Sequence, residues 1–449
     1  MVSLGFLGLY QCVSGCRSRD LDPGFGPLIH TGKNILSLPK GFAAKVISLQ
    51  GKIMSDGFLT PGAHDGMGIF RSQGKKVILI RNHELTPGSY GFGPFGKDNK
   101  FIEKVAKHKV YDLASGGDYV CVGGTTTLVY DEHTQNLDLE YLSLTGTVRN
   151  CSGGVTPWNS WITCEETNFR NGGNNGFLEK DHGYNFEVPA TEKIGLIDPR
   201  PIKAMGRFVH ESVAVHPTLG IVYQTEDEGD GLLYRYLPNK YGKVHEGGRL
   251  QCLVLNEWKR ADTRNHSEKV ADHFPERKLF DVSWIDLDDV ESPEDDLRIR
   301  GRKAGAAIFS SGEGMSYGKG ELFFTASSGG KSGNGQIFRY IPSRYEGQPR
   351  EEDAPGKLEL FIESRSIDSF QYCDNLTVAP WGDVIICEDK EDPRIIGITP
   401  NGRTYIIAQN VGYRESEFAG PVFSPSGKTL FVNIQSPGLT LAITGPWRS

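Results

Sequence analysis

The chain has 449 residues, of which 23% are charged, and a formal net charge of −7. Its basic residues form no long run or stripe, so the sequence lacks the electrostatic footprint of a protein that binds nucleic acid or an anionic membrane. The 56 glycines and 24 prolines mark many turns and aromatic residues reach 10%, which favours β structure.

The N-terminal residues 1–30 are predicted to precede a single folded domain that covers residues 31–449. Their apolar stretch, MVSLGFLGLYQCVSGC, is too short to span a bilayer and lacks the basic residues that open a secretory signal. We interpret it as a truncated export signal, which implies a periplasmic or extracellular protein. A lipoprotein cleavage site ending at Cys16 is the alternative, but no basic residue precedes it, and chance similarity explains the pattern better.

Beyond this segment, six stretches of the chain share one pattern. Each opens with a small or acidic residue, runs through a short apolar strand, turns at Gly, Pro or Asn, and returns as a β-branched or aromatic strand. The six stretches begin at Asp65, Cys151, Glu211, Glu313, Asp374 and Ala419. Coarser hairpins lie between them, and one inner plus one outer hairpin make a four-stranded blade. The repeat therefore predicts an all-β, six-bladed β-propeller.

The blades carry insertions of unequal length, which we expect to form loops and short helices over one face of the propeller. The largest insertion, residues 256–302, is rich in charge and contains KRADTRNHSEK and DLDDVESPEDDLRIR. A second insertion lies around residues 91–117. Neither contains a phosphate-binding loop, and the whole sequence lacks the GxSxG, HExxH and Walker motifs of other catalytic templates.

In a propeller, the innermost strands of all blades run in the same direction around a central channel, so equivalent positions face one another. The acids and the thiol that open the inner hairpins should therefore crowd near the axis: Asp65, Cys151, Glu211, Glu313 and Asp374. Acids that end the returning strands are expected to ring the same region: Glu84, Glu165, Glu226, Glu388 and Asp389. A single acid of this kind is usually a solvated loop residue, but recurrence at one register favours a site.

So many carboxylates in one place would repel one another unless cations compensate their charge. Carboxylate oxygens suit hard cations such as calcium, whereas a thiolate prefers a transition metal. A lone cysteine among acids therefore predicts a mixed cluster at one mouth of the propeller. For Cys151 the alternative is a buried, inert thiol, whereas Cys164 and Cys387 are interpreted as core residues. His83 and His210 are expected to orient ligands rather than bind metal.

Several motifs resemble the PhoX-type alkaline phosphatase family, and the likeness covers nearly the whole chain. The specific pieces are MSDGFLTPGAHDGM, IRNHEL, GGTTTLVYD, RNCSGGVTPWNSWITCEET, GRFVHESVAVHP with VYQTEDEGDGLLYRY, and SEFAGPVFSPSGKTLFVNIQSPG. The family consists of calcium- and iron-dependent phosphomonoesterases that are built as six-bladed propellers and are usually exported. The resemblance thus implies a metal-dependent phosphatase outside the cytoplasm.

The resemblance also implies roles for individual residues. In the family, a cysteine in the RNC-type motif bridges two ferric ions (Fe3+), and glutamates in the NHE, HES and EG motifs help to hold iron and calcium. Carried over by motif, these positions are Cys151, Glu84, Glu211 and Glu313. Further expected metal ligands come from matches between short acidic segments of this chain and of the family: Glu165, Glu166, Glu226, Asp227, Asp374 and Asp389.

The chain departs from the family pattern at two positions. Family members tend to have Arg two residues before the glutamate of the EG motif, where this chain has Ser311, and His in a late QHPG motif, where it has Ser436. An Arg at the first position would clamp a substrate phosphate. We expect Ser311 to donate one hydrogen bond instead, with Lys390 as the substituting cation. The alternative for Lys390 is a surface lysine without a part in catalysis.

The predicted function is metal-assisted hydrolysis of a small phosphate ester, in which cations neutralise the phosphoryl oxygens. Neither a membrane span nor a nucleic-acid partner is expected, and a monomer is favoured. Two alternatives stay open: a calcium-dependent propeller lactonase or esterase, and a noncatalytic scaffold that metal stabilises. Metal content separates the three, because iron with calcium favours the phosphatase, calcium alone the lactonase, and no metal the scaffold.

Overall fold

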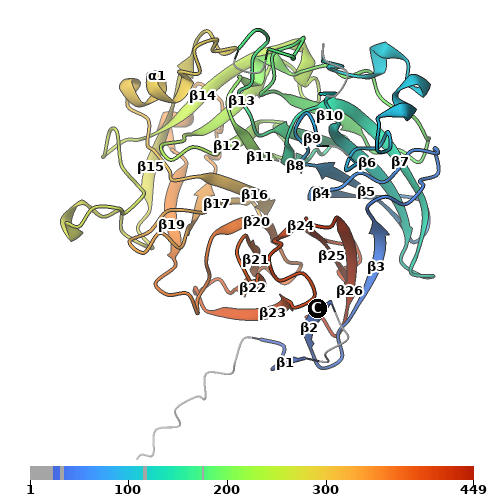
Figure 1. The fold of residues 1–449 in the computed structure, drawn as a ribbon. Helices are drawn as coiled ribbons and strands as arrows, with labels where there is room; N and C mark the ends of the chain where they lie inside the picture. The colour runs from blue at the N-terminus through green and yellow to red at the C-terminus, as the bar shows by residue number, and fades with distance from the viewer. Residues whose placement is uncertain (1–23, 31–34, 90, 115–118, 174–175, 449) are drawn as a thin grey trace, which may run out of the picture.

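The computed structural model describes residues 24–30, 35–89, 91–114, 119–173 and 176–448 (Figure 1). The expected export signal and the alternative lipoprotein site fall within residues 1–23, outside the described residues. The described chain is all-β and propeller-like, as the sequence predicted, with β-sheets arranged around a common centre. None of its helices is long and apolar enough to cross a membrane.

Within the described residues, the strands form five sheets. The first contains β4 (His64–Arg71), β5 (Lys76–His83), β6 (Gly123–Asp131) and β7 (Asn136–Thr147). The second contains β8 (Asn150–Val155), β9 (Ser160–Glu165) and β10 (Asn185–Pro189). The third has nine strands in the order β11 (His210–Val215), β12 (Val222–Glu226), β13 (Leu233–Pro238), β14 (Gly248–Leu255), β15 (Phe280–Leu287), β19 (Lys357–Glu363), β18 (Gln336–Ile341), β17 (Glu321–Ala326) and β16 (Gly312–Gly318).

The last two sheets combine strands from both ends of the chain. One has the order β1 (Leu28–Ile29), β2 (Leu36–Pro39), β23 (Thr404–Asn410), β22 (Arg394–Ile398), β21 (Val384–Glu388) and β20 (Cys373–Val378). The other has the order β24 (Phe418–Phe423), β25 (Thr429–Ile434), β26 (Leu439–Thr444) and β3 (Ala43–Leu49). Because β3 pairs antiparallel with β26, the N-terminal part of the chain supplies the outer strand of the last sheet.

The first strands of the six inner hairpins contact one another in a closed ring. The contacts run from β4 to β8, β11, β16, β20 and β24, and β24 contacts β4 again. Figure 1 shows these strands near the centre, with the remaining strands of each sheet farther out. The nine-stranded sheet carries two of the inner hairpins, β11–β12 and β16–β17, and its two halves join where β15 pairs with β19 over a short stretch.

The insertions hold the few helices. The largest one contains the 3-10 helix η5 (Val270–Asp272), strand β15 and the helix α1 (Leu297–Ala304), and the second contains η1 (Lys100–Lys104) and η2 (Lys107–Lys109). Three further 3-10 turns are η3 (Lys203–Met205), η4 (Val244–Glu246) and η6 (Glu351–Asp353). The expected short helices are therefore present, but the largest insertion also adds β15, which the sequence pattern did not reveal.

Apolar side chains pack between neighbouring sheets, because each sheet covers the face of the next. Between the first two sheets, Phe70 packs with Trp161 and Phe186. Cys164 and Cys387 are fully buried in clusters of the same kind, in agreement with their interpretation as core residues. These clusters pack the sheets against one another around the centre, and the first strand of each inner hairpin lies nearest to the axis.

Close backbone contacts surround the axis. A Cβ atom on Gly66 would lie 2.5 Å from the Cα atom of Ser152, and one on Gly314 would lie 2.6 Å from the Cα atom of Asn375. Similar contacts put a Cβ atom on Gly154 against the carbonyl of Val213, and one on Gly420 against that of Asp65. We name these four glycines the glycine collar: Gly66, Gly154, Gly314 and Gly420.

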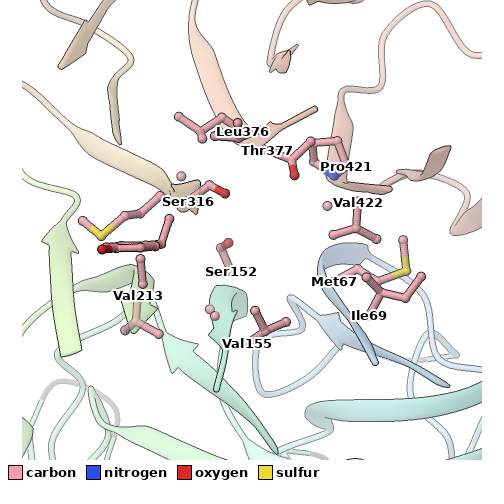
Figure 2. Close-up of a pocket in the computed structure, with 18 of the residues that line it drawn as sticks. Met67, Ile69, Ser152, Val155, Val213, Ser316, Leu376, Thr377, Pro421 and Val422 are labelled. Carbon is pink, nitrogen blue, oxygen red and sulfur yellow. The ribbon is translucent and has the colours of Figure 1, made fainter. Parts of the chain in front are cut away.

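A cavity of about 520 Å³ lies on the axis toward the carboxyl ends of the first strands (Figure 2). Its lining is mostly apolar, with a few hydroxyl groups: Met67, Ile69, Val213, Leu376 and Val422, with Ser152, Ser316 and Thr377. Collar residues also line it. The residues that open the inner hairpins lie at the other ends of the same strands, so the acids gather at the opposite mouth.

The collar predicts a steric effect of small substitutions. We expect Gly66→Ala to lower the free energy of unfolding by about 1–3 kcal/mol, because a new methyl group must displace backbone rather than a flexible side chain. Gly229→Ala is the matched control, since a Cβ atom there meets nothing within 4 Å. Denaturant midpoints of both variants measure the effect. Equal midpoints for Gly66→Ala and Gly229→Ala would contradict a tight collar.

Candidate metal centre

A β-bulge occurs at the same position in each inner hairpin. The pairing register shifts near the start of β4, β8, β11, β16, β20 and β24, and two residues of the first strand lie inside each shift. A bulge re-aims a side chain and twists the strand locally. The residues at the first bulge position are Asp65, Cys151, Glu211, Glu313, Asp374 and Gly420. The bulges thus direct the residues that were expected at the axis.

A second ring of polar residues follows directly after the returning strands. It consists of Glu84, Glu166, Asp227, Ser327, Asp389 and Gln435. Each donates its main-chain N–H to a carbonyl two or three residues before the bulge, at Ala63, Arg149, Val209, Ser311, Tyr372 and Glu417 respectively. Because this kind of hydrogen bond recurs in every inner hairpin, the second ring lies beside the first at one mouth of the channel.

The two rings surround a cavity of about 420 Å³. Its lining residues are Glu84, Arg149, Cys151, Glu166, Asp227, Glu313, Ser327, Tyr372, Asp374, Asp389, Glu417 and Gln435. Arg149 is the only Lys or Arg among the described residues of this lining. Its guanidinium lies 2.9 Å from Glu84 Oε1 and also pairs with the carboxylate of Glu166.

Of the four described groups of side chains that are close enough to share a metal ion, three lie at this mouth, with all ligand atoms of a group within 4.8 Å of one another. The groups are Asp65, Glu84 and Cys151; Cys151, Glu166 and Glu211; and Glu211, Glu313 and Asp374. Cys151 belongs to the first and second groups and Glu211 to the second and third. The three groups therefore form one continuous cluster in which the thiol and one carboxylate are shared.

Glu211 tests whether these residues fit a metal. Its side chain is fully buried, and neither carboxylate oxygen has a hydrogen-bond partner among the described residues. An unpaired buried carboxylate is costly, whereas a bound cation would satisfy both oxygens. The thiol of Cys151 lies 3.6 Å from Asp65 Oδ2 and is also buried. The donor set and the unpaired Glu211 both fit a cation cluster.

Burial and mutual repulsion shift the acids in the same direction. Burial, reinforced by neighbouring carboxylates, raises the pKa values of Asp65, Glu211 and Glu313 well above the ordinary range. The same causes, burial first, raise the pKa of Asp374 to about 7. The Cys151 thiol likewise has a raised pKa because it is buried beside Asp65 and Glu211. Without added positive charge, burial and mutual repulsion therefore disfavour the ionised form of each of these groups.

The structure brings most of the expected ligands together and leaves two outside. Eight lie in the cluster or line its cavity: Glu84, Cys151, Glu166, Glu211, Asp227, Glu313, Asp374 and Asp389. The other two are Glu165 and Glu226, the last residues of β9 and β12. Successive side chains of a strand point to opposite faces, so each of them points away from its neighbour in the second ring.

Glu165 and Glu226 instead accept hydrogen bonds mostly from residues of adjacent loops. Glu165 binds the main-chain N–H groups of Gly183 and Val148 and pairs with His182 at 2.6 Å. Glu226 accepts hydrogen bonds from the N–H of Leu232 and the hydroxyl of Tyr234. Of each expected pair, the first acid therefore holds a loop next to the mouth, while the second, Glu166 or Asp227, faces the cavity.

Ser311 and Lys390 also lie outside the described lining of the cavity. Ser311 has a positive φ of 52°, and its carbonyl accepts the hydrogen bond from Ser327. Lys390 donates from Nζ to the carbonyl of Glu391 at 2.7 Å. The described lining of the cavity has its cationic side chain at Arg149, and Lys390 was the residue expected there.

Sequence reasoning missed several lining residues, above all Arg149 and Glu417. Both precede the bulge of their hairpin, Arg149 by two residues and Glu417 by three. Had the six stretches been aligned from two residues earlier, the same register would have shown Arg149 in line with Ser311 and Tyr372. Gln435 was within the aligned segments, and its amide donates to Glu84 at 2.8 Å.

Comparison with known proteins gives one family match. The family model described as alkaline phosphatase PhoX matches residues 23–438. Among solved structures, PhoX of Pseudomonas fluorescens in complex with vanadate, a transition state analogue, is 16% identical, with a TM-score of 0.66 over 94% of this chain and 98% of that one. A gluconolactonase of Xanthomonas campestris is 11% identical, with a TM-score of 0.41 over 95% and 99%. No curated protein sequence matches significantly.

The raised pKa values predict how pH affects the chelated protein. A carboxyl group whose pKa is higher in the folded state stabilises the fold at low pH and loses that contribution as pH rises through its folded pKa. For Asp374, the contribution is lost between about pH 4 and pH 7. We therefore expect the chelated protein to be less stable at pH 8 than at pH 5.5, by about 2 kcal/mol from the ionisation of Asp374 alone.

Melting of the chelated protein across this pH range measures the effect, and Glu211→Gln should flatten the decline because it removes one ionising group. The exposed Glu352→Gln serves as the control and should leave the slope as in the wild type. A chelated protein whose stability rises between pH 5.5 and pH 8 would contradict the crowded-acid arrangement.

Proposed function

The chain belongs to the PhoX family of alkaline phosphatases, and we propose that it hydrolyses phosphate monoesters at the acidic cavity described above. One observation carries this proposal: a buried, continuous cluster of carboxylates and one thiol that ends at a cavity containing a single arginine. The carboxylates suit cations, and the cavity of about 420 Å³ has room for a small substrate.

We propose calcium and ferric iron as the cations. Carboxylate oxygens match calcium, and the buried thiol of Cys151 favours a transition metal. The residues that would hold them are Asp65, Glu84, Cys151, Glu166, Glu211, Glu313 and Asp374, with Asp227 and Asp389 at the rim. Bound there, the cations would supply positive charge that neutralises the phosphoryl oxygens.

Side chains of the second ring orient these ligands. Ser327 donates its hydroxyl to Glu313 Oε1 at 2.7 Å, and Gln435 donates to Glu84 Oε2 at 2.8 Å. Both are neutral donors, so they fix the carboxylates without competing for their charge. Their role in the proposed reaction is to hold the ligands in one orientation, which lowers the cost of ordering the site.

Arg149 is proposed to bind the substrate phosphate. Burial lowers the pKa of its guanidinium, but Glu84 and Glu166 together raise that pKa by more than burial lowers it. The net pKa is therefore above the ordinary value, and the side chain is charged at neutral and alkaline pH. A guanidinium offers two parallel N–H donors to phosphate, which a lysine or serine cannot do. Ser311 and Lys390 lie outside the described lining of the cavity, and we propose only weaker contacts between them and the phosphate.

We also propose that the propeller has six blades, with the nine-stranded sheet taken as two blades that β15 joins. The recurrence of the bulge and of the second-ring hydrogen bond in all six inner hairpins supports that count. We propose further that residues 31–449 form a single domain and that the protein is a monomer. We also propose a location in the periplasm or outside the cell, and this proposal rests on the family resemblance alone.

Activity and metal content together test the proposed function. We expect the purified protein to contain iron and calcium by elemental analysis and to hydrolyse an aryl phosphate. Chelation should abolish turnover, and return of the cations should restore it. Calcium without iron, together with turnover of a lactone but not of the phosphate ester, would overturn the phosphatase in favour of a lactonase. Absence of both metals would favour a scaffold.

The role of Arg149 has its own test. Replacing the two-pronged guanidinium with a single ammonium group in Arg149→Lys should raise KM for the aryl phosphate about ten- to a hundredfold, because one charge-assisted hydrogen bond of about 1.5–3 kcal/mol is lost. Lys390→Ala is the comparison and should change KM less than Arg149→Lys. Metal content must be equal in both variants, because Arg149 also neutralises Glu84 and Glu166. An unchanged KM in Arg149→Lys would remove this residue from substrate binding.

A further inference from the structure

Four buried side chains among the described residues connect neighbouring inner hairpins. Each lies on a returning strand and donates a hydrogen bond to the main-chain carbonyl of a cluster residue on the next hairpin. Asn82 donates to Cys151 at 3.1 Å, Thr225 to Glu313 at 2.6 Å, Thr325 to Asp374 at 2.7 Å, and Asn433 to Asp65. All four donors are buried at 2% exposure or less.

The donors share one register. Each precedes a second-ring residue by two positions, as Thr325 precedes Ser327 and Asn82 precedes Glu84. Because side chains alternate along a strand, donor and second-ring residue lie on the same face and both turn toward the first strand of the next hairpin. In the two remaining inner hairpins, the equivalent position holds Cys164 or Cys387, whose weak S–H donor cannot replace an amide or hydroxyl.

The direction of these bonds is the same throughout. The hairpin of β4 and β5 holds the carbonyl of Cys151 in β8, the hairpin of β11 and β12 holds that of Glu313, and the next one holds that of Asp374. Asn433 in β25 holds Asp65 in β4, so this bond joins the C-terminal sheet to the first inner strand. Each of these four hairpins therefore places a ligand that belongs to its neighbour.

A hydrogen bond to the main-chain carbonyl of a bulge residue fixes the position of that residue's Cα atom. It thereby also fixes the direction of the residue's side chain. We infer that Asn82, Thr225, Thr325 and Asn433 are positioning residues that set the geometry of the cation cluster. The inference rests on the proposed function only in that the cluster binds cations; it does not depend on which ester is hydrolysed.

Thr325 offers the sharpest test, because its hydroxyl can be removed without a large change in volume. Thr325→Val deletes the donor to Asp374, and Thr325→Ser keeps it. Thr145→Val is the matched control: the Thr145 hydroxyl is buried and has no hydrogen-bond partner among the described residues. The measurement is the rate at which each full-length, metal-loaded protein loses calcium and iron to an excess of chelator.

We expect Thr325→Val to lose cation about tenfold faster than the wild type, a change of about 1.4 kcal/mol. Thr325→Ser and Thr145→Val should release cation at the wild-type rate. Chelated Thr325→Val should melt only slightly below chelated Thr145→Val, because the Asp374 carbonyl loses one buried donor while the apolar core is unchanged. Much faster release with so small a change in melting separates positioning of ligands from general loss of stability.

Two results would overturn the inference. One is a Thr325→Val protein that retains cation as well as Thr145→Val. The other is faster release that Thr325→Ser shows equally, because the hydroxyl would then have no role. A wild type that holds cations but turns over no phosphate ester would overturn the proposed function alone, whereas a wild type without cations would overturn both.

Discussion

Crowding of carboxylates at a buried mouth is the constraint on which the rest of this structure depends. Closing a ring of hairpins brings equivalent positions together, and here five of those positions carry an acid or a thiol. Glu211 illustrates the result, since its carboxylate is fully buried and unpaired within the described chain. Burial and repulsion both oppose its charge, so the folded chain has a built-in need for cations or protons.

Several features of the surrounding structure position the crowded carboxylates and confine them to one mouth. Bulges aim the first-ring residues, and the glycine collar permits the first strands to approach until a cluster can form. On the other side of the collar the channel is apolar, which leaves the ionic chemistry at one mouth. Alternation along the returning strands then separates neighbouring acids, so that Glu166 faces the cavity while Glu165 accepts hydrogen bonds from main-chain N–H groups.

Arg149 neutralises part of the negative charge at the acidic mouth. In a cavity lined by acids, one guanidinium pairs with two carboxylates and still faces the open space. Cations bound to those carboxylates would share that task and free the guanidinium for a phosphate. In the proposed function, the same set of residues would stabilise the empty fold and recognise an anionic substrate, so that a strongly acidic site could act on phosphate esters.

The sequence by itself determined the repeat, and the repeat was enough to predict an all-β, propeller-like chain, the buried Cys164 and Cys387, and an acidic cluster around Cys151. These features follow from local patterns, namely strand alternation, turn residues and one recurring register. Only the tertiary structure decided which of two adjacent acids faces the axis, because alternation along a returning strand separates the two side chains and the packing of the sheets sets which face meets the channel. It also decided that Arg149 lies in the cavity and Lys390 outside it, since that choice depends on how separate hairpins meet in space.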